Sequence, residues 1–132
     1  MKSIEKDFVP KAESIELKHL GFIEACHRGW DADGKIWYHP DSSIVTDNPT
    51  FSQAFRFFRD KYGLFIRSDF DVNYLDKLDE FQTTYFFSIL KMEESLVGFK
   101  PLGRLNNEKS YEEAELECLK KLIEIVKSKK ED

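Results

Sequence analysis

The chain has 132 residues, of which 41% are hydrophobic and 14% aromatic, and its formal net charge is −5. A chain of this length is expected to form one domain that folds without disulfides or a metal. The negative charge argues against general nucleic-acid binding. No run approaches the roughly 18 apolar residues of a membrane span, and residues 1–10 lack the apolar core of a secretory signal. We therefore expect no membrane association and a cytoplasmic location.

A helix is predicted over residues 10–20. Pro10 suits the first helical turn, where a missing N–H costs nothing, and Gly21 suits the position after the last turn. The apolar stripe of this helix is assigned to Ala12, Ile15, Leu17 and Leu20.

A β-hairpin is predicted next, with strands over residues 22–30 and 35–39. Asp31 begins the connecting turn and Gly34 supplies its positive φ. Residues 40–49 are polar and rich in turn formers, which predicts a loop.

A second helix over residues 50–62 is the clearest element of the pattern. Thr50 is a suitable N-cap, and Gly63 stands where the helix is expected to end. Apolar side chains recur at the spacing of one buried helical face: Phe51, Ala54, Phe55, Phe58 and Tyr62.

Strands are predicted over residues 64–72 and 81–92. The intervening residues 73–80 are acidic and indicate a loop or a short helical turn. In the second strand both faces carry apolar residues, so its second face is expected to meet a partner chain, a ligand or a helix. Residues 96–105 include Pro101, which restricts them to a short edge strand or an ordered loop.

The last helix is predicted to begin at Ser110, which forms a capping box with Glu113. Its buried stripe has helical spacing: Tyr111, Ala114, Cys118, Leu119, Leu122, Ile123 and Val126. Together these elements predict an α+β fold of order α-ββ-α-ββ(β)-α, with an antiparallel sheet of about four to five strands and about three helices. Residues 1–132 are expected to form a single domain, frayed at 1–7 and 127–132.

Three blocks of the sequence carry a resemblance to a known group of proteins. They are residues 8–10 with 17–22, residues 51–64, and residues 110–115 with 118–126. In this order and spacing they resemble small uncharacterised proteins carried by phages and prophages of Bacteroides-type bacteria. The resemblance implies a phage setting and a counter-defence or host-modifying role, and it supplies no catalytic residues.

No catalytic constellation emerges from the sequence. Cys26 and Cys118 are expected to be reduced, buried thiols. Cys26 and His27 are adjacent and would face opposite sides of a strand, and no metal-ligand spacing is present. We therefore expect no metal, no cofactor and no catalytic residues, and a small hydrolase is the least favoured class.

A ligand site is hypothesised around the second helix. Arg56 and Arg59 are neighbours on its exposed side, and an arginine pair beside aromatic rings can hold a phosphate and stack a base. Four further side chains complete the candidate set: Phe57, Arg67, Trp37 and Tyr38. The alternative is an ordinary helix surface, with both arginines paired to nearby acids and the aromatic rings filling the core.

The function expected from these patterns is binding rather than catalysis. The favoured hypothesis is a homo-oligomeric phage protein that sequesters a small anionic signal resembling a cyclic nucleotide. The alternative is an inhibitor or adaptor that acts on a host protein.

Overall fold

The structure is a computed structural model that describes residues 7–75, 80–92, 99–107 and 111–131. These residues form three helices and six strands, and the strands make two antiparallel sheets, which confirms the predicted α+β class. The residue contacts define two compact units: unit 1 is Met1–Phe57 with Ile123–Asp132, and unit 2 is Phe58–Leu122. Among the described helices, none has the length and apolarity needed to span a bilayer.

Unit 1 begins with α1, Lys11–His19, for which Pro10 is the N-cap residue. Ser14, Leu17 and Leu20 are its buried positions, spaced three residues apart. The predicted stripe was therefore correct for the two leucines and wrong for Ala12 and Ile15, which are exposed. At about 100° per residue, Ala12 and Ile15 lie roughly 140° and 160° from the centre of the face formed by the buried positions, so they point away from it.

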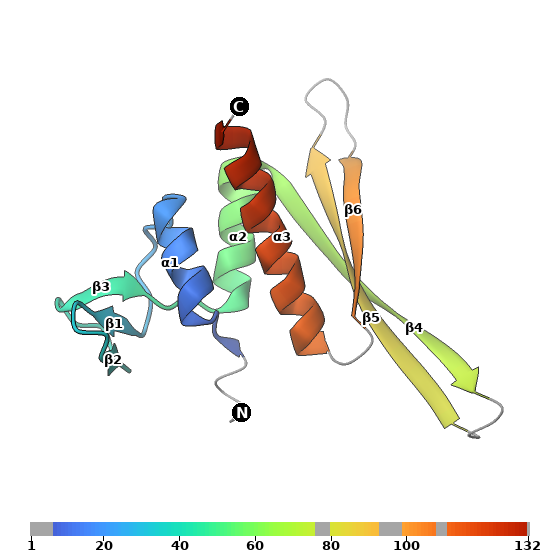
Figure 1. Cartoon of the computed structure of the whole chain (residues 1–132), viewed down its shortest axis with the longest axis horizontal. Coiled ribbons are helices and arrows are strands. Elements are labelled where there is room, and N and C mark those ends of the chain that lie inside the picture. The colour runs from blue at the N-terminus through green and yellow to red at the C-terminus, as the bar shows by residue number, and fades with distance from the viewer. Residues whose placement is uncertain (1–6, 76–79, 93–98, 108–110, 132) are drawn as a thin grey trace. The chain divides into compact units, whose positions relative to one another are not determined.

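The sheet of unit 1 has the order β2-β1-β3 and lies beside α1 (Figure 1). Its strands are short: β1 is Gly29–Asp31, β2 is Ile36–Trp37 and β3 is Ile44–Asp47. The predicted strand over residues 22–30 was thus too long, because only its last two residues join the ladder. The predicted loop over residues 40–49 was wrong at β3, where β-branched side chains favour an extended edge strand.

The turn between β1 and β2 matches its prediction. The Asp31 carboxylate accepts hydrogen bonds from the backbone N–H groups of Asp33 and Lys35, both at 2.9 Å. Its other oxygen accepts the indole N–H of Trp37 at 2.9 Å. Gly34 has a φ of 84°, which side-chain-bearing residues adopt rarely.

Close approach of β1 and β3 requires Gly29. A Cβ at this position would lie 2.5 Å from the Thr46 carbonyl oxygen and 2.5 Å from Ile44 Cγ2. The absence of a side chain therefore allows β3 to pair, and this steric signal is not visible in the local sequence pattern.

Helix α2, Phe51–Tyr62, begins after a confirmed N-cap at Thr50. The Thr50 hydroxyl accepts the N–H of Gln53 at 3.2 Å, and Gln53 Oε1 accepts the N–H of Thr50 at 2.9 Å. This reciprocal pair is a capping box. On the predicted apolar face, Phe51, Ala54 and Phe58 are buried, and Phe55 and Tyr62 are half-buried.

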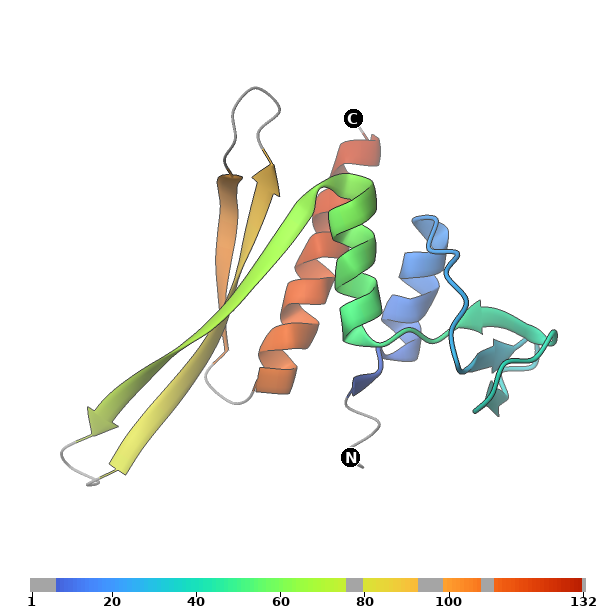
Figure 2. The same cartoon turned by 180° about the vertical axis from the view of Figure 1, so that it is seen from behind.

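Unit 2 contains the larger sheet, of order β4-β5-β6 (Figure 2). β4 is Leu64–Leu75, β5 is Glu80–Met92 and β6 is Phe99–Asn107. β4 pairs with β5 along its whole length, so the predicted irregular segment 73–80 is strand at both of its ends, and residues 76–79 lie outside the described residues. β6 is an edge strand, and it pairs only with the second half of β5.

The core of unit 2 lies between the sheet and α3, Tyr111–Glu131, whose first part belongs to this unit. It is almost entirely apolar: Phe58, Leu64, Phe86, Phe87, Ile89, Ala114, Cys118, Leu119 and Leu122 are buried. Phe86 and Phe87 are consecutive strand residues, so both faces of β5 are covered at this point. The predicted cap Ser110 lies outside the described residues.

One feature of the predicted architecture needed correction. The strands form two separate three-stranded sheets in place of a single sheet, because β3 adds a third strand to the first hairpin. The described tail is helical to Glu131, with Val126 buried and Lys127 Nζ 3.2 Å from Glu16 Oε2, and fraying of residues 127–132 stays a prediction. Residues 1–6 and 132 lie outside the described residues, and the single-domain assignment stays a prediction.

Candidate functional site

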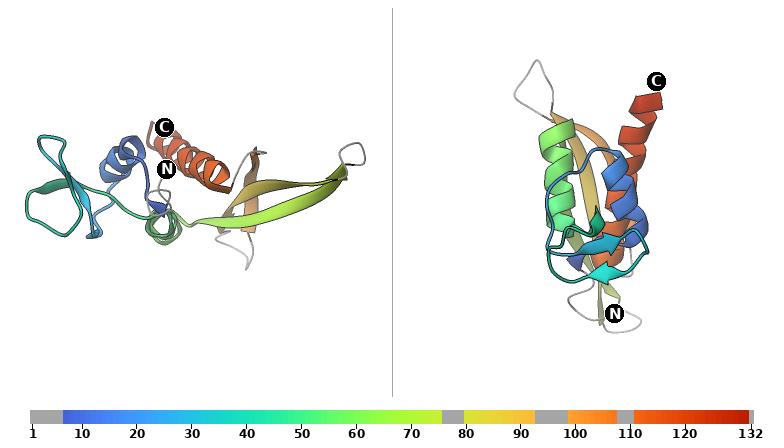
Figure 3. Two further views of the ribbon diagram at one scale, coloured as in Figure 1. Left: turned by 90° about the horizontal axis from the view of Figure 1, so that it is seen from below. Right: turned by 90° about the vertical axis from the view of Figure 1, so that its left-hand side faces the viewer.

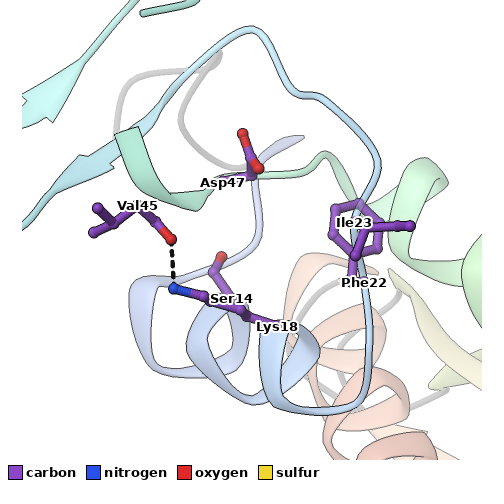
Figure 4. A pocket seen from close by; sticks show the side chains of 6 residues that line it. All are labelled: Ser14, Lys18, Phe22, Ile23, Val45 and Asp47. Carbon is purple, nitrogen blue, oxygen red and sulfur yellow. Dashed lines mark hydrogen bonds between the residues drawn. The ribbon is translucent and has the colours of Figure 1, made fainter. Parts of the chain in front are cut away.

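An open pocket lies among the described residues of unit 1 (Figure 4). It lies where α1, the segment after α1 and β3 meet, and its volume is about 370 Å³. Pockets that hold small ligands or side-chain groups span about 300–1,000 Å³, so this one is at the small end. Six residues line it: Ser14, Lys18, Phe22, Ile23, Val45 and Asp47.

Charged groups of both signs line the pocket. The Lys18 ammonium donates a 2.6 Å hydrogen bond to the backbone carbonyl of Val45, which Figure 4 shows as a dashed line. This bond occupies an acceptor on edge strand β3. The carboxylate of Asp47 also lines the pocket, two residues further along β3. A ligand here would meet one ammonium and one carboxylate, so the site does not select for net negative charge.

Exposed apolar side chains flank the same pocket. Ile23 is 91% exposed and Val45 is 48% exposed. Phe22, next to Ile23, is buried and packs edge-to-face on Phe57, with the ring centroids 5.5 Å apart. Ile23 and Val45 therefore give the pocket a joint exposed apolar lining, and contiguous exposed apolar surface is what marks a docking site.

A buried polar network supports the pocket through Ser14. The fully buried Asn48 donates to the Val9 carbonyl at 2.6 Å and to Ser14 Oγ at 3.2 Å. It accepts the Nε–H of the buried Arg28 at 2.6 Å. The network connects the start of α1, β1 and the end of β3, and such bonds restrain the wall of the pocket because breaking them would leave buried polar groups unpaired.

Arg28 is also held by aromatic rings. Its guanidinium carbon lies 4.0 Å from the ring centroid of Phe8 and 5.6 Å from that of Tyr38. A guanidinium between two rings gains cation–π stabilisation. Tyr38, one of the predicted ligand residues, is 67% exposed and covers this arginine.

Cys26 lies near the carboxylates of Asp47 and Glu24 and is not an activated nucleophile. Burial, together with the smaller effect of the carboxylates of Asp47 and Glu24, raises the pKa of its thiol to about 12. Burial and the nearby Glu115 likewise raise the pKa of Cys118 to about 12. Both thiols are free and buried. They are therefore almost fully protonated at neutral pH, whereas reactive cysteines have lowered pKa values.

The predicted ligand residues are distributed over both units. In unit 1, Arg56 Nη2 lies 2.7 Å from Glu24 Oε1, and Phe57 packs on Phe22. Trp37 is hydrogen-bonded to Asp31. In unit 2, Arg59 Nε lies 3.1 Å from the carboxylate of its neighbour Asp60, and Arg67 is exposed on β4. Each of these contacts is of the kind expected for the alternative, an ordinary helix surface and core filling, and whether any of the residues binds a ligand stays a prediction.

The pocket residues were not identified from the sequence. α1 and the segment just after it supply four of them, and the other two come from β3, more than twenty residues further on, which was predicted to be a loop. One sequence signal did point to the site: Phe22 and Ile23 directly follow Gly21, so two large apolar residues leave the helix together. Ile23 was assigned to the predicted strand over residues 22–30, which concealed its exposure.

The described residues offer no metal centre, since none of their carboxylate, imidazole and thiol groups gather in threes with suitable geometry. Comparison of the chain with family models, curated proteins and solved structures found no match.

Proposed function

We propose that the protein is a non-enzymatic binding protein whose unit 1 docks a short segment of a protein partner at the Ile23 pocket. The observation that carries this proposal is the 91% exposure of Ile23 beside an open pocket of about 370 Å³. Burying such a side chain stabilises a complex by about 1.5–3 kcal/mol, the size of an interface anchor.

The lining of the pocket describes the partner segment. An apolar side chain of the partner would contact Phe22, Ile23 and Val45. A basic or N–H group beside it would pair with Asp47, because this carboxylate lines the same pocket. Lys18 would keep its bond to the Val45 carbonyl or give it up to an acceptor of the partner. Mixed apolar and polar contacts of this kind fit a peptide better than a polyanion.

This proposal favours the protein-partner alternative over the anionic signal. A phosphate at Arg56 would compete with a 2.7 Å ion pair to Glu24, and a phosphate at Arg59 with Asp60. The phage setting and the counter-defence role are proposed together with it and rest on the sequence resemblance alone. The cytoplasm of a bacterial host is proposed as the location, from the sequence pattern and the same resemblance.

A displayed random peptide library, selected on the intact protein, tests the peptide site directly. Selected peptides are synthesised and titrated by calorimetry against the wild type, Ile23→Asp and Ile15→Asp. Ile23→Asp is expected to weaken binding roughly tenfold or more, because it places a charge where an apolar contact forms. Ile15→Asp is the matched control, since Ile15 is also exposed but does not line the pocket.

Selected peptides whose affinity is unchanged by Ile23→Asp would refute the site. A separate calorimetric experiment tests the anionic-signal hypothesis: cyclic di- and trinucleotides are titrated at low salt against the wild type and Arg56→Ala. Binding heat that is measured with the wild type and lost in Arg56→Ala would support sequestration of a nucleotide and contradict the peptide proposal.

A further inference from the structure

The outer edge of β4 is the largest unprotected strand edge among the described strands. β4 is 12 residues long and pairs only with β5 in the described part of the chain. It contains no proline, lysine or glycine, and its pairing with β5 runs from Leu64 to Leu75 in one constant register. A long regular edge without such interruptions is a template for another strand.

The opposite edge of the sheet is protected differently. β6 contains Lys100, Pro101 and Gly103, and the register between β5 and β6 shifts between Ile89 and Leu90. A proline cannot donate to an added ladder, and a bulge twists an edge away from partners. The contrast between the two edges makes β4 the one suited to strand addition.

Two residues in the first half of β4, Arg67 and Ser68, are exposed, whereas Leu64 at the start of the strand is buried. The hairpin end of β4 and β5 continues past the first turn of α3 (Figure 3). Between Glu80 and Thr84, β5 pairs only with β4 among the described strands, because its pairing with β6 begins at Tyr85. Two-stranded ribbons are marginally stable alone, so a strand that pairs with Asp71 and Val72 would support this one where it leaves the three-stranded sheet.

We propose that two copies of this chain associate through antiparallel pairing of their β4 edges, centred on Ser68. The alternation along the start of β4 places Leu64 and Ile66 on one face and Phe65 and Arg67 on the other. A two-fold register centred on a residue keeps like faces together, whereas a register centred between residues would mix them.

Charge selects one register among those that keep the faces together. Centring on Ser68 places Arg67 of each copy opposite Asp69 of the other, so symmetry forms two opposite-charge pairs. Centring on Arg67, Asp69 or Asp71 places each of these residues opposite its own copy, and centring on Phe70 places Asp69 opposite Asp71. Like charges directly opposite each other on paired strands are destabilising, and opposite charges stabilise. Only the Ser68 register has an opposite-charge pair and no like-charge pair among these five.

The pairing of two β4 strands needs only a second copy of the chain and does not depend on the Ile23 pocket. The resulting sheet would have the order β6-β5-β4-β4-β5-β6, with both protected β6 strands at its edges. Strand addition of this kind removes the two open edges that aggregation would otherwise use.

Sedimentation velocity on four charge variants tests the register. Arg67→Asp and Asp69→Arg are each expected to weaken the dimer roughly tenfold, because each converts two opposite-charge pairs into like-charge pairs. The double variant, Arg67→Asp with Asp69→Arg, restores the opposite pairs and is expected to restore the dimer. Lys120→Glu on the exposed side of α3 is the control and is expected to leave association unchanged.

Cysteine cross-linking supplies a second readout that does not depend on the charge variants folding well. Ser68→Cys is expected to form a disulfide between copies on mild oxidation, since directly opposite residues have Cα atoms about 4.5–5.5 Å apart. Ser52→Cys, exposed on α2, is the control and is expected to associate like the wild type without forming a disulfide between copies. A wild type that stays monomeric at its solubility limit would overturn the proposal. So would a dimer that is insensitive to both single charge variants and is not linked by Ser68→Cys.

Discussion

The sheets of the two units each have three strands, but different interactions hold them. In unit 1 the strands are two to four residues long, and buried polar groups fix them: Asn48, Arg28 and Ser14 through hydrogen bonds, and Asp31 through its turn. In unit 2 the strands are 9 to 13 residues long and pack on an apolar core. Short ladders therefore depend on a few specific side chains, whereas long ladders depend on the amount of buried apolar surface.

The largest expected effect is on the apolar core of unit 2. Phe87→Ala is expected to lower the free energy of unfolding by about 3–5 kcal/mol, because Phe87 is buried and its ring contacts that of Tyr111 at 5.6 Å. Urea unfolding followed by far-ultraviolet circular dichroism measures the loss, and Lys120→Ala is the exposed control. Both tryptophans, Trp30 and Trp37, lie in unit 1. If the tryptophan fluorescence and the circular dichroism change over the same range of urea concentration, the chain unfolds as one domain.

The next effect concerns the polar network of unit 1. Asn48→Ala is expected to cost about 1–3 kcal/mol, because it leaves the buried Arg28 Nε–H and the Val9 carbonyl without their Asn48 partner. Ser14→Ala removes a single side-chain hydroxyl of the same network and is expected to cost less. Tryptophan fluorescence during urea unfolding reports on both variants. An Asn48→Ala protein as stable as the wild type would show that the short sheet does not depend on this network.

A smaller effect is a dependence of stability on pH that involves both units. The thiols of Cys26 and Cys118 have pKa values raised from 9.0 to about 12. Between these values the folded state binds more protons than the unfolded state, so stability falls as pH rises from about 9 to about 12 and is fully retained below 9. Urea midpoints measured across this window are expected to fall more steeply in the wild type than in a Cys26→Ala, Cys118→Ala double variant. Equal slopes would show that burial does not hold the thiols protonated.

The smallest effect is expected at the surface ion pair of Arg56 with Glu24, whose side chains are 50% and 41% exposed. Arg56→Ala is expected to change the free energy of unfolding by less than about 1 kcal/mol. A double-mutant cycle with Glu24→Ala isolates the coupling between the two charges. A coupling well above this value would mean that the pair fixes the segment after α1 in the way that Asn48 fixes β3.

Local signals explain which parts of the fold were predictable. The Thr50 cap, the spacing of Phe51, Ala54 and Phe58, and the Asp31–Gly34 turn each act within a few residues, and all three predictions were confirmed. The α+β class followed from combining such elements.

Long-range partners determined the features that the sequence pattern did not predict. The length of β1 is set by its pairing with two short strands. The pairing of β3 is possible because Gly29 has no Cβ. Asn48 was read as part of a polar loop, because asparagine is usually exposed, yet it is completely buried. The pocket combines Lys18, Ile23 and Val45 from three segments, so no single window of sequence contained it.

The chain order of the two units has a consequence for synthesis. Unit 2 is one continuous segment, Phe58–Leu122, whereas unit 1 is completed only by Ile123–Asp132. Those last residues supply the buried Ile123 and Val126 and the contact of Lys127 with Glu16. Domains usually fold on the ribosome from the N-terminus onward. Here unit 2 is complete as soon as Leu122 has been synthesised. Residues 1–57 were made earlier, but unit 1 can complete its packing only after Ile123–Asp132 have followed.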